Sequence, residues 1–340
     1  MYVEQLVFME DVTNSLANAG DQFKAIEAQI IEAKQAENSA LSYKVVPFFN
    51  NNQFFLLATI KYNDVRLVGA PPSSIGKFGA DTDNWVFPRH TGDFSLFRVY
   101  DENGSAFIPP KHLKVNIAPR TPGEFTMVFG YPGRTQEYLT AVEMNQLVNV
   151  ENVRRVEIRN VLLTIMDAEM RANAEVQLKY ASKYARIANG WKKWIGKIEG
   201  VQFSKGLDRK RKLEAEFTAR ITADANLWNK YNSLLNDIVV NKTQLAEAQI
   251  KRNEFIETIY YGMEWFSLIS KLQRVKDDLN LFETLIEFNK NYSRTVSEKT
   301  TTAMLAMALE TFPNLIGDHD QESFVRLVHN EIETLVAIAQ

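Results

Sequence analysis

The sequence predicts an α+β protein in two successive parts, the first rich in short strands and the second all-helical. Nine of the ten prolines lie at or before Pro132, and Pro313 is the only later one. Nine of the fifteen glycines lie at or before Gly133. Because these residues mark turns and interrupt helices, short elements are expected first and long helices afterwards. We therefore expect one domain over residues 1–145 and a second over residues 146–340, as the chain length also suggests.

The first part carries alternating and aromatic-rich segments that are typical of strands. An amphipathic pattern over residues 21–40 predicts one helix among them. Single strands are expected over 2–9 and at 65–72, where a further strand ends. Paired strands are expected over 41–49 with 54–62, within 94–107, and within 125–141. Many short strands at this spacing indicate a barrel or a sandwich.

In the second part, apolar residues recur at helical spacing over several turns. The segments with this pattern are 150–189, 207–221, 231–266 and 322–339. Asp320 precedes the last segment and is a plausible N-cap. The basic run DRKRK at 208–212 could bind phosphate, but acidic residues follow it directly, which favours a solvated helix face. We expect a bundle of long antiparallel helices.

The composition excludes several classes of function. A net charge of −3 gives no electrostatic case for nucleic acid, and no apolar run is long enough to span a membrane. The chain has no cysteine, which excludes disulfides and thiol catalysis. Its four histidines show no ligand spacing and no phosphate-binding glycine motif occurs, so we expect neither a metal nor a cofactor. The first residues show no signal-peptide pattern.

The segment DTDNWVFPRHTGDFSLF at residues 81–97 follows neither a helical nor a strand period. One interpretation is a polar surface loop with internal ion pairs, in which Arg89 and Arg98 meet Asp81, Asp83 or Asp93. Another is a calcium loop, although the glycine and glutamate that such a loop needs at its sixth and twelfth positions are missing. The third is a catalytic loop, with Asp93 orienting an imidazole and with Asn84 and Trp85 shaping a substrate pocket.

The segments GKFGADTDNWVFPRHTGDFSLFRVY and FGYPGRTQEYLTA resemble the bacterial dipeptidyl-peptidases of the dipeptidyl-peptidase 7 and 11 type. Weaker resemblance covers VFMEDVTNSL and ARIANGWKKWIGKIEG, so that nearly the whole chain falls in the central region of that family. The departures are modest. Ala80 stands where the family usually has a second glycine, and Val86 with Phe87 replaces a Met-Trp pair.

The resemblance implies a chymotrypsin-like double β-barrel with a large helical domain inserted, and it implies that Asp93 is the acid of a Ser-His-Asp triad. On this view residues 1–145 form part of the barrel domain and residues 146–340 form a helical lid. No serine of the sequence has a nucleophile context, and His90 matches the family's loop histidine and not its base. The chain is therefore expected to be a fragment that is inactive alone, because a triad needs all its members.

The resemblance also implies release of dipeptides from free peptide amino termini, in the periplasm or at the cell surface, and it suggests a homodimer. Asn84 matches a residue that holds the substrate amine, Asn189 matches a second, and Trp85 would wall the same subsite. Trp85 could instead be core, and Asn189 could be a surface residue or a C-cap before Gly190. If both amides hold one ammonium, they should lie within about 6 Å of each other.

An alternative from another class is a non-catalytic helical interaction protein that carries a degenerate peptidase barrel. The preference for the substrate residue that precedes the cleaved bond is set by residues of the family that lie outside the region of resemblance.

Overall fold

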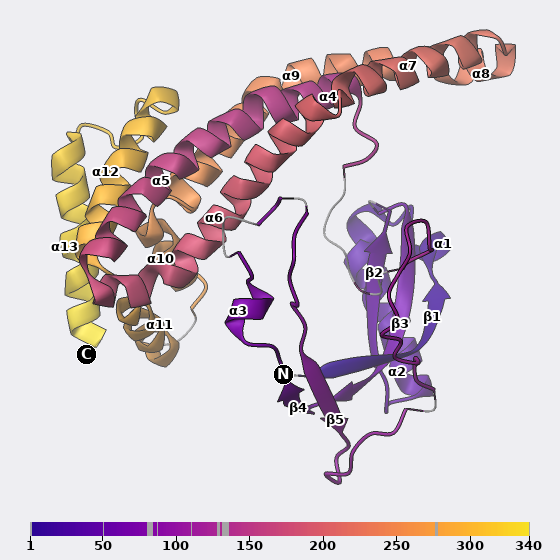
Figure 1. Ribbon diagram of the computed structural model, residues 1–340, viewed down its shortest axis with the longest axis horizontal. Coiled ribbons are helices and arrows are strands. Elements are labelled where there is room, and N and C mark those ends of the chain that lie inside the picture. The colour runs from indigo at the N-terminus through magenta and orange to yellow at the C-terminus, as the bar shows by residue number, and fades with distance from the viewer. Residues whose placement is uncertain are drawn as a thin grey trace. The chain divides into compact units, whose positions relative to one another are not determined.

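The computed structural model describes residues 2–49, 51–79, 84–86, 88–109, 111–127, 130, 136–275 and 278–339. The chain forms two compact units (Figure 1). The first comprises residues 1–78 and 90–129, and the second comprises residues 79–89 and 130–340. The segments 79–89 and 130–145 thus group with the helices that follow them.

The first unit contains a three-stranded antiparallel sheet in the order β1-β3-β2. Its strands are β1 (Val3–Asp11), β2 (Ser42–Phe48) and β3 (Gln53–Tyr62), and β2 and β3 form the expected hairpin. Short α1 (Thr13–Leu16), η1 (Gly20–Gln22) and the longer α2 (Phe23–Glu37) lie between β1 and β2. Side chains of β3 alternate, so that Phe54 and Leu56 face α1 and α2 and form a small core with Val12 and Leu16.

A second sheet of this unit pairs β4 (Asp64–Gly69) with β5 (Leu96–Tyr100), and α3 (Ser73–Gly76) lies between them in the chain. The second strand expected within 94–107 is reduced to an isolated bridge between Tyr100 and Ala106. Asp101 closes a tight turn there by accepting from the backbone nitrogens of Asn103 and Ser105. Proline follows at 109, and because proline cannot donate a ladder hydrogen bond, the pairing stops.

The hairpin expected over 125–141 does not form in the described part of that segment. Residues 125–127, 130 and 136–140 adopt no strand, and residues 128–129 and 131–135, with most of the GYPGRT turn, lie outside the described residues. The described strands close no barrel. They form small antiparallel sheets, which together with the helical unit make the protein α+β.

The second unit is helical, as the sequence predicts. Its elements are α4 (Ala141–Gln146), the π-helical η2 (Leu147–Glu151), α5 (Asn152–Ala172), α6 (Ala174–Phe203), α7 (Gly206–Thr222), α8 (Ala225–Tyr231), α9 (Leu234–Phe255), the π-helical η3 (Ile256–Tyr260), α10 (Glu264–Leu272), α11 (Asp278–Lys290), α12 (Arg294–Thr311) and α13 (Gln321–Ala339). Asp320 caps α13 as expected, because its carboxylate accepts from the backbone nitrogen of Ser323 at 2.9 Å. In the described residues, no helix combines the length and the apolar character needed to cross a bilayer.

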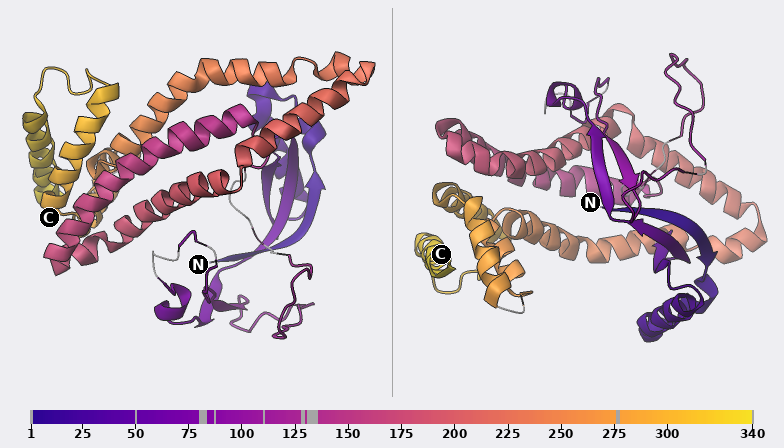
Figure 2. Two further views of the ribbon diagram at one scale, coloured as in Figure 1. Left: turned by 45° about the horizontal axis from the view of Figure 1, so that its top comes forward. Right: turned by 90° about the horizontal axis from the view of Figure 1, so that it is seen from below.

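Helices α5 and α6 form an antiparallel hairpin around Asn173, which caps α6, and the two lie side by side in both Figure 1 and Figure 2. The main core of this unit packs α12 and α13 against the hairpin and η3. It is centred on side chains that are almost completely buried, among them Ile158, Leu162, Tyr180, Met304 and Leu305. The burial of these large side chains is the main stabilising contribution of the unit.

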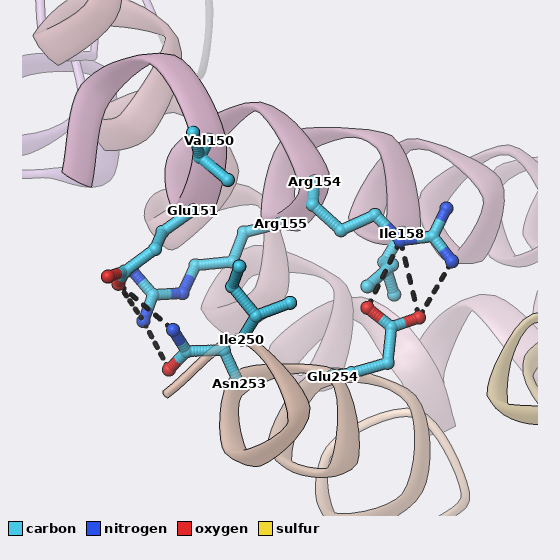
Figure 3. A pocket seen from close by; sticks show the side chains of 8 residues that line it. All are labelled: Val150, Glu151, Arg154, Arg155, Ile158, Ile250, Asn253 and Glu254. Atoms are coloured by element: carbon cyan, nitrogen blue, oxygen red, sulfur yellow. Dashed lines mark hydrogen bonds and ion pairs between the residues drawn. The ribbon is translucent and has the colours of Figure 1, made fainter. Parts of the chain in front are cut away.

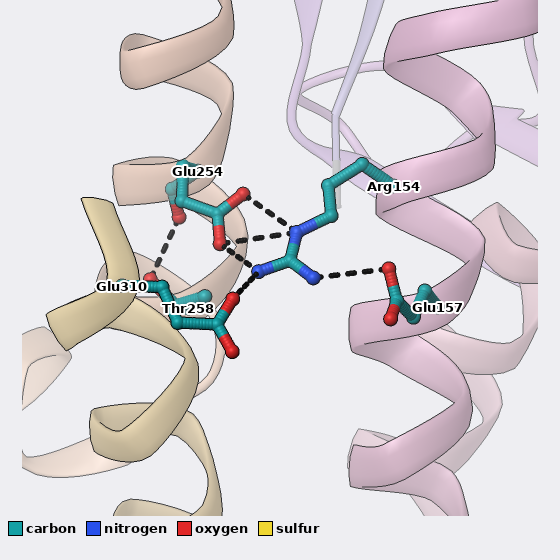
Figure 4. A network of polar contacts seen from close by, with 5 residues as sticks. All are labelled: Arg154, Glu157, Glu254, Thr258 and Glu310. Carbon is teal, nitrogen blue, oxygen red and sulfur yellow. Dashed lines mark hydrogen bonds and ion pairs between the residues drawn. The ribbon is translucent and has the colours of Figure 1, made fainter.

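Arg154 and Arg155 of α5 tie that helix to α9, and Arg159 ties it to η3 through Glu257. Arg154 contacts the carboxylates of Glu157, Glu254 and Glu310 (Figure 4). Of these, the side chain of Glu254 is only 3 % exposed. Arg155 donates to Asn253 at 2.6 Å (Figure 3). Between these contacts lies a cavity of about 30 Å³. It has room for about one water and is far too small for a peptide.

Candidate active site

The structure brings together Asn84, Trp85 and Asn189, which come from two distant parts of the chain but belong to the same unit. The side-chain oxygen of Asn189 accepts from Asn84 Nδ2 at 3.1 Å and from Trp85 Nε1 at 2.8 Å. Arg89 Nη1 donates in turn to the side-chain oxygen of Asn84 at 3.3 Å. The two amides are therefore within hydrogen-bond distance, closer than the expected limit of about 6 Å.

Asn189 lies within a continuous helix and is exposed. Helix α6 runs through Gly190 to Phe203, so Asn189 is not a C-cap. It shares one face of α6 with Lys193 and Gly196, because positions four and seven residues apart lie on the same side of a helix. This is the face that meets the segment of Asn84 and Trp85.

Trp85 is 50 % exposed, which excludes the interpretation of Trp85 as a core residue. Its φ of 59° is left-handed, a conformation that is uncommon for a bulky side chain and costs roughly 1–2 kcal/mol. The hydrogen bond to Asn189 helps to hold this conformation. Strained backbone of this kind occurs preferentially at functional sites.

Gly196 allows the close approach of Trp85 to α6. A Cβ at this position would lie 3.2 Å from the backbone oxygen of Trp85 and 3.8 Å from its Cβ. Lys193 adds a positive charge on the same face, 5.9 Å from the centre of the indole ring. Burial lowers the pKa of the nearby Lys197, and the neighbouring charges of Lys193 and Arg155 lower it further.

Asp93 belongs to the first unit, is exposed and lies three residues before β5. The preceding residues are fixed to α3. Thr91 Oγ1 donates to the backbone oxygen of Gly76 at 2.9 Å, and the Gly92 nitrogen donates to that of Ile75 at 3.2 Å. A Cβ on Gly92 would lie 2.9 Å from a methyl group of Ile75, so that the Ile75 side chain would have to shift.

The polar-loop interpretation expects Arg89 and Arg98 to pair with acidic residues of the same segment. Among the residues that the structure describes, Asp93 makes no ion pair with Arg98, which belongs to the same unit, and Asp81 and Asp83 are not among them. The start of the calcium-like run, residues 81–83, is not among them either. No group of three metal-ligating side chains occurs among the residues that the structure describes.

Three site features were not predicted from the sequence. These are the contact of Gly196 with Trp85, the donor Arg89, and Arg159, which reaches from α5 to the turn of α6 before Asn189. A signal for the first was present, since glycines at 190 and 196 interrupt an otherwise helical pattern without ending the helix.

Residues 1–334 match the sequence profile of peptidase S46. The chain belongs to the peptidase S46 family. It is 39 % identical over 348 aligned residues to the Asp/Glu-specific dipeptidyl-peptidase of Capnocytophaga gingivalis, covering 94 % of this chain and 49 % of the relative. It is 32 % identical to dipeptidyl-peptidase 7 of Phocaeicola vulgatus, covering 92 % of this chain and 48 % of that protein.

The fold of this S46 chain also resembles a solved structure. Porphyromonas endodontalis DPP11 in complex with the dipeptide Arg-Asp matches with a TM-score of 0.73 and 24 % identity, over 99 % of this chain and 60 % of that one. At this identity the likeness shows the fold alone. The chain spans about half the length of the curated relatives it matches.

Proposed function

We propose that this chain is part of a serine dipeptidyl-peptidase that releases dipeptides from free peptide amino termini. The observation that carries the proposal is the contact of Asn84 and Trp85 with Asn189 in a member of the peptidase S46 family. The two relatives named above are both called dipeptidyl-peptidases, and one of the names adds a specificity for Asp and Glu. The removal of dipeptides is therefore the activity that their names share.

The side-chain amides of Asn84 and Asn189 bind the substrate ammonium in this proposal. An amide oxygen has two acceptor positions, and both positions of Asn189 are filled by Asn84 Nδ2 and Trp85 Nε1. The ammonium therefore replaces Asn84 Nδ2. The amide of Asn84 then turns over and gives up the hydrogen bond from Arg89 Nη1. Its oxygen now faces the same nitrogen, so that two oxygens accept from one cation while Trp85 keeps its bond to Asn189.

This anchor determines which peptide bond of the substrate is cleaved. Two extended residues span about 7 Å, so an ammonium held at that distance from the nucleophile presents the second peptide bond for cleavage. The exposed indole of Trp85 supplies a rigid apolar wall for the first side chain. A chain with a blocked amino terminus cannot donate to both oxygens and is excluded.

Asp93 is the triad acid in this proposal and holds the imidazole of a histidine in the correct tautomer. The 340 residues carry no serine in a nucleophile context, so that alone they hydrolyse no dipeptidyl substrate. The strands of the first unit belong to a larger chymotrypsin-like barrel. The exposed apolar side chains of the edge strand β1, among them Leu6, Val7 and Met9, support this view. On resemblance alone we extend the proposal to a periplasmic or cell-surface location and a homodimer.

The test is Asp93→Asn in the complete enzyme. We expect the fold to persist and turnover to fall roughly 10⁴-fold, because the amide orients the imidazole in the wrong tautomer. The matched control is Asp101→Asn, since Asp101 is a half-buried acid of the same unit whose oxygen only closes a turn. Normal turnover by Asp93→Asn, or an equal loss in both variants, would remove Asp93 from the triad. No hydrolysis by the wild type would favour the non-catalytic alternative.

A further inference from the structure

We propose that Arg159 is a positioning residue that fixes the turn of α6 carrying Asn189. The inference rests on the function proposed for Asn189. Arg159 lies on α5 and its side chain is 11 % exposed. It donates from Nη1 to the backbone oxygen of Ile187 at 3.0 Å, two residues before Asn189.

The guanidinium of Arg159 is itself held on two further sides. Its Nε donates to Glu257 at 2.7 Å, and that carboxylate is 4 % exposed. Its Cζ lies 4.3 Å from the ring centre of Trp194, one helical turn beyond Gly190. Arg159 therefore connects η3 with two successive turns of α6, and its fork of donors allows this in a way that a lysine ammonium cannot.

Gly190 makes the contact possible. A Cβ at this position would lie 2.3 Å from Arg159 Nη1, so that any side chain would expel the guanidinium. Ile187, Gly190 and Trp194 share the face of α6 that meets α5, while Asn189 lies on a neighbouring face. Rotation or unwinding of this turn would carry the Asn189 oxygen away from the ammonium, and a displacement of about 1 Å is enough to cost 10²-fold in rate.

The neighbouring arginine provides a matched control. Arg154 also lies on α5 and also pairs with a buried carboxylate, that of Glu254 on α9, at 2.7 Å. Its other ion pairs go to Glu157 and Glu310, and in the described part of the chain none of its partners lies on α6. Replacing the guanidinium of Arg154 by a lysine ammonium therefore weakens an α5–α9 ion pair without changing a contact near Asn189.

The experiment is a double-mutant cycle in the complete enzyme, with kcat/KM for a dipeptidyl substrate as the readout. We expect Arg159→Lys to lower kcat/KM about 10- to 100-fold. In the Asn189→Ala background the same substitution should change kcat/KM less than about twofold, because the group that it positions is gone. Arg154→Lys should leave kcat/KM near that of the wild type. Glu257→Gln, which keeps the shape of the partner, replaces Arg159→Lys in the cycle if the latter does not fold.

The outcomes separate the inference from the function on which it rests. Effects of Arg159→Lys and Asn189→Ala that simply multiply, or an equal loss in Arg154→Lys, would overturn the positioning role while Asn189 keeps its own. An unchanged kcat/KM in Asn189→Ala would instead overturn the amine anchor and the inference together.

Discussion

The indole nitrogen of Trp85 donates a hydrogen bond to the side-chain oxygen of Asn189 at 2.8 Å. This bond joins residues 104 positions apart and fixes the segment around Trp85 to the helical unit. It also occupies one of the two acceptor positions on the Asn189 oxygen, which leaves a single position for the substrate. The geometry of the anchor therefore depends on how closely Trp85 approaches α6.

Gly196→Ala should move Trp85 without unfolding the protein. The new methyl group would lie 3.2 Å from the backbone oxygen of Trp85, so that the exposed segment has to shift by a few tenths of an ångström. We expect KM to rise severalfold, while the thermal stability stays equal or increases because alanine favours a helix. Gly200→Ala is the control, since no atom lies within 4 Å of its added Cβ. An unchanged KM in Gly196→Ala would show that this contact does not position Trp85.

Arg154→Met should strongly destabilise the helical unit. Glu254 is 3 % exposed and would remain buried without its cation, a situation that typically costs about 3–5 kcal/mol. Denaturant unfolding measures this loss of free energy. Arg211→Met is the control, because the pair of Arg211 with Asp208 is exposed and such pairs contribute about 0–1 kcal/mol. Equal losses in the two variants would contradict the account of the Arg154 network.

Lys197 should react with acylating reagents at lower pH than an exposed lysine. Its pKa is lowered by burial and then by Lys193 and Arg155, so that the neutral, reactive amine forms earlier. Between that pKa and the ordinary value the unfolded state binds more protons, so this group makes stability rise with pH in that window. Lys193→Gln should raise the pKa of Lys197. Labelling at the rate of the exposed Lys212 would contradict the shift.

The sequence predicted the local elements better than their pairing. The helix around residues 23–37, the hairpin of β2 and β3 and the Asp320 cap follow from periodicity and capping chemistry, which are local. The prediction of a second strand near Ala106 was wrong. The turn formed by Asp101 and the proline at 109 outweigh the strand propensity of this segment. The sheets depend on long-range pairing that no local pattern encodes.

The approach of Asn84 to Asn189 was predicted from the resemblance, but the hydrogen bonds that link them and the residues that support them were not. Asn84, Trp85 and Asn189 were identified by resemblance, and their contact is a tertiary fact. The supporting residues Arg159 and Glu257 belong to no sequence motif. They become partners only because α5 packs against η3. Their role could not be read before the helices were packed.

The central claim is that Asn84 and Asn189 recognise a free amino terminus. The most direct measurement compares kcat/KM for a dipeptidyl substrate with a free amine and for the same substrate N-acetylated, in the complete wild-type enzyme and in Asn189→Ala. Because a hydrogen bond to a charged group contributes about 1.5–3 kcal/mol, we expect the preference for the free amine to fall roughly 10- to 100-fold in the variant. An unchanged preference would contradict the claim.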